Sequence, residues 1–391
     1  MRRSLTLAIL PLAVAETLVW AALYYVFPAL LPVWEQDFGW SRGEVSGAFT
    51  ASLIVMALAA PRAGRLIDLG HERTMFLGAM VLGAVLLASL AWVTELWQFW
   101  AIWIAIGLVN ACILYEACFA IITVLLGAKA RSGITTVTLV AGFAGTVCFP
   151  AYFALTEAFG WRVAVQVFAA VTVLVSVPLA WVGLRALEHH RQPPADRPAE
   201  TGGEGRAVLR KPAFWGLALG FAAVGLVHGM LISHIRPILG DAGLAAATAI
   251  FVASLMGPMQ VVGRIVMVAL QSRVDAFGAG VGAFGGMAVG LVLLLSAGAV
   301  PWLAVLFVLP YGACWGIMSI VRPVLTAEFL GRAGFGVISG MIAVPFVLGS
   351  AAGPIMSAWL WELAGYDLVL ELSLGLALLG MASVIAAKRM A

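Results

Sequence analysis

Long apolar runs alternate with short polar stretches along the chain. The hydrocarbon core of a bilayer is about 30 Å thick, and a helix rises 1.5 Å per residue, so a crossing helix needs about 20 apolar residues. The runs are too long for strands and lack strict alternation, so we expect helices rather than a barrel. They predict twelve spans, at residues 5–33, 43–60, 74–94, 98–126, 133–156, 162–186, 213–238, 244–269, 277–298, 301–327, 335–359 and 367–387.

The longest polar stretch divides these spans into six plus six. Residues 188–212 contain Pro193-Pro194 and Gly202-Gly203 among charged side chains. A segment of this composition cannot bury a core and is typical of a flexible linker. We therefore predict an N-terminal half at 1–187, a linker at 188–212 and a C-terminal half at 213–391.

The composition agrees with a membrane protein and argues against other classes. The chain is 63% hydrophobic and 10% charged, whereas a soluble domain is about 25% charged. The start resembles a signal peptide, but apolar residues continue past Glu16 to Pro32, which favours a retained first helix. No catalytic, phosphate-binding or metal-ligand motif occurs, so we predict no enzyme, no cofactor, no metal and no nucleic-acid partner.

Positive charge is distributed unequally between alternate loops. If the N-terminus lies inside, the loops on the opposite side contain only three arginines, Arg42, Arg162 and Arg236. The excess of lysine and arginine elsewhere predicts cytoplasmic termini and a cytoplasmic linker in the cell inner membrane. Tryptophans near span ends, including Trp34, Trp92 and Trp161, are interpreted as interfacial anchors.

The turn between the second and third spans carries a motif. Residues 64–73 read GRLIDLGHER, which resembles the GxLaDrxGrR loop of the major facilitator superfamily with one residue fewer between Asp68 and Gly70. The carboxylate of Asp68 can meet a helix N-terminus or an arginine and close the cytoplasmic side. We therefore assign Gly64, Asp68, Gly70 and Arg73 to a cytoplasmic gate.

This resemblance covers nearly the whole chain and implies a fold and a mechanism. Members are all-α polytopic proteins with twelve transmembrane helices in two six-helix bundles. The bundles rock about a central cavity lined by spans 1, 4, 7 and 10, and such transporters generally act as monomers. Residues 38–42, FGWSR, resemble the monocarboxylate and oxalate/formate branches. Trp103 stands where drug/proton antiporters usually carry an arginine, which argues against that branch.

The spans that the resemblance assigns to the cavity also contain much of the unusual polarity. A charge at mid-bilayer costs on the order of 3 kcal/mol, so it normally faces a protein interior or a watery cavity. Span 8 adds Gln260 and Arg264, which share one helix face. The predicted substrate-binding residues are Arg322, Arg264, Tyr311, Asn110, Tyr115, Tyr24, Tyr25, Gln260 and His228.

Two arginines have alternative roles. Arg264 or Arg322 can bind an anionic substrate, because a guanidinium is always charged and matches a carboxylate with two hydrogen bonds. Arg322 can instead form a structural ion pair with Glu116 or extend to the lipid interface. Arg264 lies close to its helix end, which favours a gate or interfacial role.

A buried acid is the best candidate for carrying protons. Burial favours the protonated form of a carboxyl group, so Glu16 can bind and release a proton. Glu116 is the second candidate. The alternative is a glutamate that stays neutral or paired within the bundle. His228 titrates in the appropriate range, but a lone histidine is more often a hydrogen-bonded core residue.

These observations predict a secondary transporter whose partners are a small-molecule substrate, protons and the lipid bilayer. We expect proton-coupled symport of a small organic anion of the monocarboxylate kind by alternating access. The alternative is a proton-driven exporter of drugs or metabolites from the same superfamily, with a mainly aromatic cavity that tolerates loss of either arginine. A sensor or scaffold would need an output domain, which the short polar loops do not provide.

Overall fold

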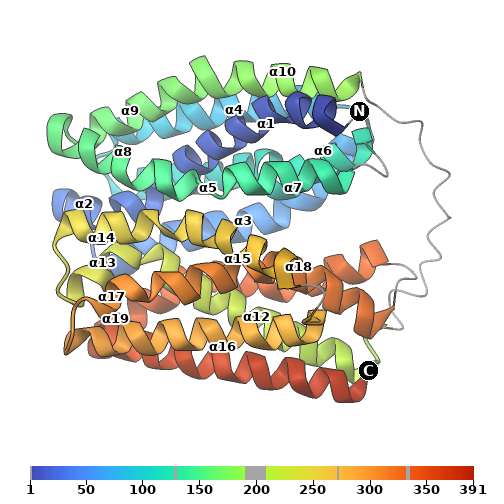
Figure 1. Ribbon diagram of the computed structural model, residues 1–391. Helices are drawn as coiled ribbons and strands as arrows, with labels where there is room; N and C mark the ends of the chain where they lie inside the picture. The colour runs from blue at the N-terminus through green and yellow to red at the C-terminus, as the bar shows by residue number, and fades with distance from the viewer. Residues whose placement is uncertain (1, 127–129, 190–207, 271–272, 332–334) are drawn as a thin grey trace. The chain divides into compact units, whose positions relative to one another are not determined.

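The computed structural model describes residues 2–126, 130–189, 208–270, 273–331 and 335–391. Within these ranges all regular structure is helical. Contacts divide the chain into two compact units, Met1–Arg197 and Pro198–Ala391 (Figure 1). Most of the predicted linker, residues 190–207, lies outside the described residues.

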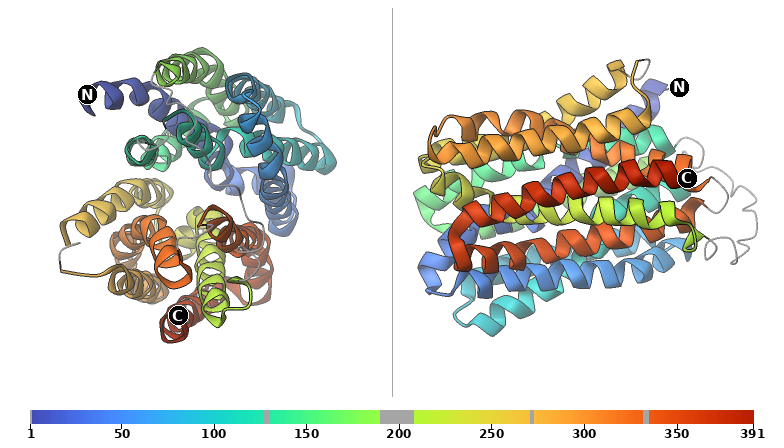
Figure 2. Two further views of the ribbon diagram at one scale, coloured as in Figure 1. Left: turned by 90° about the vertical axis from the view of Figure 1, so that its right-hand side faces the viewer. Right: turned by 90° about the horizontal axis from the view of Figure 1, so that it is seen from below.

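Unit 1 consists of helices packed side by side, as its end-on view in Figure 2 shows. Helix α1 contacts α7, α8 and α10, while α3 packs against α5, and α4 against α5 and α9. The bounds are α1 (Arg2–Leu23), α2 (Val26–Phe38), α3 (Arg42–Asp68), α4 (Glu72–Ser89), η1 (Leu90–Trp92), α5 (Leu96–Ile113), α6 (Tyr115–Leu126), α7 (Ala130–Ala141), α8 (Ala144–Phe159), α9 (Trp161–Val171), η3 (Thr172–Ser176) and α10 (Val177–Glu188).

Unit 2 is built around three close helix pairs. Helix α12 packs along α19, and α18 packs against both α15 and α16. The bounds are α12 (Pro212–Ser233), α13 (Ile235–Asp241), α14 (Ala246–Ser254), α15 (Met256–Leu270), α16 (Ala276–Leu295), η4 (Ser296–Gly298), α17 (Leu303–Leu306), α18 (Val308–Leu330) and α19 (Phe335–Met390).

Eleven helical segments of the described residues are long and apolar enough to cross a membrane. The last one, Met341–Met390, is bent, because Ala364 and Gly365 leave the helical conformation and Gly365 has a φ of 75°. Glycine adopts positive φ without the steric cost that a Cβ atom imposes. The bend falls between the predicted spans 335–359 and 367–387. The chain is thus an all-α polytopic membrane protein, as predicted.

The first span is interrupted at Tyr24 and Tyr25. Tyr25 N donates to Trp20 O at 2.9 Å, and Phe27 N donates to Tyr24 O at 3.2 Å, so the regular four-residue spacing is lost. Pro28 has no N–H group that could bond to Tyr24 O, which explains the break at this position. The fourth span is interrupted at Leu114, whose backbone is extended with a ψ of −174°.

Small residues allow close packing in unit 2. A Cβ atom on Gly263 would meet the backbone of Ala313, and one on Gly316 would meet the backbone of Gln260. Helix α16 carries a glycine at every fourth position from Gly278 to Gly290, and this face is used in part. Gly286 and Gly290 approach Cys314 and Tyr311 of α18, whereas a Cβ atom on Gly282 would find open space. Close approach of this kind is common between membrane helices.

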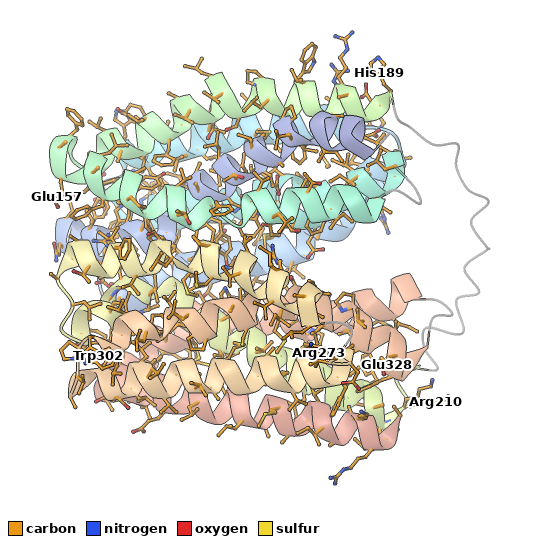
Figure 3. All side chains as sticks on the ribbon, viewed as in Figure 1. Glu157, His189, Arg210, Arg273, Trp302 and Glu328 are labelled. Carbon is orange, nitrogen blue, oxygen red and sulfur yellow. The ribbon has the colours of Figure 1, made fainter. Side chains whose placement is uncertain are left out.

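The polar ends of each unit agree with the predicted spans. In unit 1, Glu157 and His189 lie at opposite ends of the helices, and in unit 2 Trp302 and Arg210 do so (Figure 3). Trp92 and Trp302 are 69% and 59% exposed, which agrees with interfacial anchoring. That interpretation is wrong for Trp34 and Trp161, which are 0% and 5% exposed. The two indoles pack edge-to-face at 6.2 Å instead, because the end of the bundle is filled by aromatic rings.

Candidate functional site

A buried acid lies at the centre of unit 1. Glu16 on α1 is 0% exposed, and its Oε1 accepts a hydrogen bond of 3.2 Å from Trp20 Nε1, one helical turn later. Its other oxygen, Oε2, is buried without a hydrogen-bond partner among the described residues. An ionised carboxylate in such surroundings is costly unless a cation or further donors compensate for the lost water.

Four aromatic side chains form a group beside this acid. The centroid of the Trp20 ring lies 4.8 Å from the ring centroid of Tyr24, 6.1 Å from that of Tyr25 and 4.6 Å from that of Tyr115 in α6. These four residues are called the aromatic cluster below. Tyr24 and Tyr25 occupy the interruption of the first span, and Tyr115 follows the interruption of the fourth. Trp20 therefore links the two irregular segments, and three predicted binding residues pack around it.

Side chains replace the hydrogen bonds that the broken first span loses. The N–H groups of Tyr25 and Phe27, which would normally bond to Ala21 O and Leu23 O, bond elsewhere. Asn110 Nδ2 donates to Leu23 O at 3.1 Å, and Cys148 Sγ donates to Ala21 O at 3.3 Å. Both contacts are buried, so they stabilise the interruption by satisfying carbonyl groups that have no water. Asn110 Oδ1 is buried without a hydrogen-bond partner among the described residues.

Glu116 differs from Glu16 in its surroundings. It lies in the first turn of α6, and its side chain is exposed. Glu116 therefore lacks the enclosed surroundings that distinguish Glu16.

The centre of unit 2 contains stacked rings. His228 of α12 lies on Trp315 of α18 with ring centroids 3.4 Å apart and planes 7° apart. On α18, Tyr311 is also nearly parallel to His228, at 6.3 Å and 9°. His228 Nδ1 and the Tyr311 hydroxyl are buried without hydrogen-bond partners among the described residues. This arrangement leaves two polar atoms of the site with unused hydrogen-bonding capacity.

The two predicted arginines also lie in unit 2. Arg264 of α15 is 9% exposed, and its Nε donates to Gly316 O at 3.4 Å. The close packing of α15 on α18 makes this contact possible. Arg322 of α18 is half-buried, and its guanidinium carbon lies 4.4 Å from the ring centroid of Phe346. Gln260, one turn before Arg264, is half-buried as well. Arg264 therefore contacts a backbone carbonyl, and Arg322 contacts an aromatic ring.

The predicted gate lies at the turn after α3. Gly70 has a φ of 82°, and its N–H donates to Ile67 O while His71 N donates to Leu66 O, which closes the helix end with two hydrogen bonds. Arg73 pairs with Glu188 of α10 at 3.7 Å and lies 5.5 Å from the Trp181 ring. A Cβ atom on Gly64 would meet nothing. The side chain of Asp68 lies outside the described part of the chain.

The residues that suggested a transporter branch organise the opposite end of unit 1. Gly39 ends α2 with a φ of 69°, and Ser41 begins α3 by accepting a hydrogen bond from Glu44 N. Arg42 Nη2 donates to Glu35 Oε2 at 2.8 Å. This part of the motif therefore caps two helices and joins them by an ion pair.

A second ion pair joins the first span to the sixth at the same end. Asp37 Oδ2 accepts hydrogen bonds from Trp161 Nε1 at 3.1 Å and from Arg162 Nη1 at 2.8 Å. The guanidinium of Arg162 also lies over the Trp161 ring at 4.4 Å. Because Trp161 and Arg162 begin α9 directly after Gly160, these contacts hold the start of that helix against the end of α2.

Sequence reasoning missed several participants. Trp20, Trp315 and Phe346 had no assigned role, although the four-residue spacing of Glu16 and Trp20 was a usable signal. His234 was missed as well. It is 0% exposed, with Nδ1 2.9 Å from the Tyr366 hydroxyl and Nε2 3.1 Å from Pro354 O. Nothing in the local sequence indicates this long-range connection between the end of α12 and α19.

Within the described ranges, no group of three or more histidine, cysteine, aspartate or glutamate side chains could hold a metal ion. The polar centres of the two units contain side chains suited to binding organic groups and protons. Unit 1 offers a carboxyl group, an amide and tyrosines, and unit 2 offers guanidinium groups, an imidazole and stacked rings.

Comparison with known proteins identifies the fold and the family. Residues 12–354 match the profile of the Major Facilitator Superfamily. A structure of a variant of the nucleoside transporter NupG is similar to this chain, with a TM-score of 0.76, 15% identity and 99% coverage of both chains. A bacterial homologue of the human lysosomal transporter Spinster, inward-facing and occupied, gives a TM-score of 0.70 at 15% identity, with 98% of this chain and 96% of that chain covered. No curated protein sequence matches this chain significantly.

Proposed function

Because the chain belongs to the Major Facilitator Superfamily and is a secondary transporter rather than an enzyme, we propose that it moves a small organic anion together with protons. In this proposal the substrate crosses by alternating access, Glu16 carries the proton, and Arg322 binds the anionic group. We propose that both termini lie in the cytoplasm, because of the excess of positive charge in the loops on that side. We also propose that the protein lies in the cell inner membrane and acts as a monomer.

The observation that carries the proposal is the environment of Glu16. Its carboxyl group is fully buried and receives one hydrogen bond, from Trp20, while Oε2 receives none among the described residues. Enclosing an ionised carboxylate in this way costs several kcal/mol, so the group holds a proton when enclosed and releases it when water enters. Opening and closing of the surrounding helices would then couple proton binding to transport.

The interruptions beside Glu16 support this coupling. The aromatic cluster joins the broken segments of the first and fourth spans, and Trp20 belongs both to the cluster and to the hydrogen bond of Glu16. A bend at Tyr24 would therefore change the packing of Tyr24 and Tyr25 on Trp20, the hydrogen-bond partner of the acid. Discontinuous helices place backbone groups and side chains at substrate and ion sites in other secondary transporters.

The arginines of unit 2 support an anionic substrate. A guanidinium stays charged in any environment and can bind a carboxylate with two parallel hydrogen bonds. Arg322 is the better candidate, because it is half-buried beside Phe346 and therefore combines partial desolvation with access. Arg264 is more enclosed and donates to the Gly316 carbonyl, which favours a role in holding α15 against α18.

Transport by purified protein in proteoliposomes tests the proposal. We expect short carboxylates to accumulate against their gradient when an inward proton gradient is imposed, and to equilibrate without one. A sodium gradient of equal size at constant pH is the control and should drive no accumulation. Accumulation driven only by sodium would refute proton coupling. A panel in which cationic drugs move and carboxylates do not would refute the anionic substrate.

The alternative is a proton-driven exporter of amphipathic drugs or metabolites. The aromatic cluster of unit 1 favours it, because such rings bind planar and cationic compounds without a charged partner. Arg322→Ala separates the two functions. Loss of transport for every substrate of the panel supports the organic anion, whereas retained drug efflux in this variant supports the exporter.

A further inference from the structure

Aromatic side chains in unit 2 form a row of nearly parallel rings. His228 lies between Tyr311 and Trp315, with planes 9° and 7° from theirs. Phe346 of α19 continues the row at 6.0 Å from Trp315, with an angle of 19° between the planes. Three helices, α12, α18 and α19, contribute these rings. We call these four side chains, Tyr311, His228, Trp315 and Phe346, the row.

A cation ends the row. The guanidinium carbon of Arg322 lies 4.4 Å from the centroid of the Phe346 ring. Arg322 follows Trp315 by seven residues on α18, which is two helical turns or about 10 Å along the same face. Helical side chains point back toward the N-terminus, so Arg322 extends in the direction of Trp315. The rings of Trp315 and Phe346 thus lie beside the positive charge of Arg322.

The two ends of the row differ in exposure. Tyr311 and His228 are 0% and 8% exposed, as expected for rings that fill the interior of a bundle. Trp315, Phe346 and Arg322 are only half-buried. Interior packing accounts for the buried end, but it does not require parallel rings and a guanidinium at the accessible end.

The buried end carries unused polar atoms. His228 Nδ1 and the Tyr311 hydroxyl have no hydrogen-bond partner among the described residues, although both are buried. Buried polar groups are normally satisfied, so an orphaned pair indicates a site completed by a bound molecule or by water. His228, which carries one of these atoms, stacks directly on Trp315 and so joins the polar end of the row to its accessible end.

We infer that the substrate is an aromatic or heteroaromatic carboxylate, whose ring lies against Trp315 and Phe346 and whose carboxylate binds Arg322. This inference rests on the proposed function and makes its substrate class specific. Offset or edge contacts between aromatic rings add to the gain from burying apolar area, which a saturated ring of the same size cannot match.

Binding of matched ligands to the purified full chain in lipid nanodiscs, measured by calorimetry, tests the inference. Benzoate should bind about tenfold more tightly than cyclohexanecarboxylate, which has the same charge and a similar size but no π face. Benzamide, which keeps the ring and lacks the charge, should bind too weakly to measure.

Substitutions test whether the row causes the preference for benzoate over cyclohexanecarboxylate. Trp315→Leu should bring the two carboxylates within about twofold of each other, while Trp315→Phe, which retains a ring, should keep most of the preference. Trp302→Leu is the matched control, because Trp302 is 59% exposed at the end of the unit, and it should leave the preference unchanged. Arg322→Lys should weaken both carboxylates alike, since it removes the two-pronged contact but no ring.

The outcomes separate this inference from the function on which it rests. Equal binding of benzoate and cyclohexanecarboxylate by the unmodified protein would overturn the aromatic class and leave an organic-anion transporter. Benzamide binding as tightly as benzoate would contradict the anionic substrate. A tenfold preference that persists in a folded Trp315→Leu variant would show that another surface recognises the ring, and it would overturn the assignment to the row.

Discussion

The centres of the two units differ in charge and in helix geometry. Unit 1 holds a buried acid beside interruptions in its first and fourth spans. Unit 2 holds arginines and stacked rings, and its helices are interrupted at His234, Leu255 and Phe307 rather than at the rings. His228 lies within α12 and Trp315 within α18, each a continuous helix at that point. The difference suggests a division of labour, in which unit 1 binds the proton and bends, and unit 2 binds the anion and stays rigid.

The largest expected effect concerns the rigidity of unit 2. In Gly316→Val the new side chain would meet the backbone of Gln260, which cannot move without separating α15 from α18. Overpacking typically costs 1–3 kcal/mol, and we expect at least about 3 kcal/mol here because backbone rather than a flexible side chain is in the way. The yield of folded protein and its thermal unfolding measure the effect. Gly282→Val, on a face with open space, is the control and should be tolerated.

The next effect concerns the interruption in unit 1. Asn110→Ala leaves the buried Leu23 carbonyl without its donor, and an unsatisfied buried group costs about 1–3 kcal/mol. We expect a lower unfolding temperature together with faster hydrogen exchange in residues 20–27. Faster exchange throughout unit 1, rather than near the interruption, would mean that Asn110 stabilises general packing and not the break.

A smaller effect separates the two arginines. Arg322→Lys should weaken carboxylate binding about tenfold, the equivalent of 1.4 kcal/mol, because an ammonium cannot replace the guanidinium fork. Arg264→Lys should leave affinity within about twofold and instead reduce stability slightly, since Arg264 donates to the Gly316 carbonyl. Parallel titrations and melting curves of both variants measure this. The reverse pattern would transfer the anion site to Arg264.

Hydropathy alone predicted the membrane helices, since each must contain about 20 apolar residues whatever its neighbours are. The ends of the spans were predicted less accurately than their existence. The predicted seventh span reached residue 238, but α12 ends at Ser233, where His234 bonds to Tyr366 and Pro354 across the unit. Such contacts depend on the packing of distant helices, which the local sequence does not encode.

The helix interruptions in unit 1 show the same limit of prediction from the local sequence. The break at Tyr24 follows from Pro28 and was accessible to reasoning about backbone hydrogen bonds. The break at Leu114 contains neither proline nor glycine, so the local sequence carried no signal for it. The candidate residues were found by their polarity within apolar runs, whereas their aromatic partners are apolar themselves and could not be distinguished from ordinary packing.

Proton movement in Glu16→Gln tests the central claim most directly. The measurement follows acidification or alkalinisation of vesicles, reported by a trapped pH-sensitive dye, when a carboxylate gradient is imposed. Glu157→Gln, at an exposed acid near the end of α8 (Figure 3), serves as the matched control and should behave like the unmodified protein. We predict that Glu16→Gln abolishes carboxylate-driven proton movement while exchange of labelled carboxylate continues within about twofold, because glutamine mimics the neutral acid but cannot release a proton. Undiminished proton movement in this variant would contradict the account.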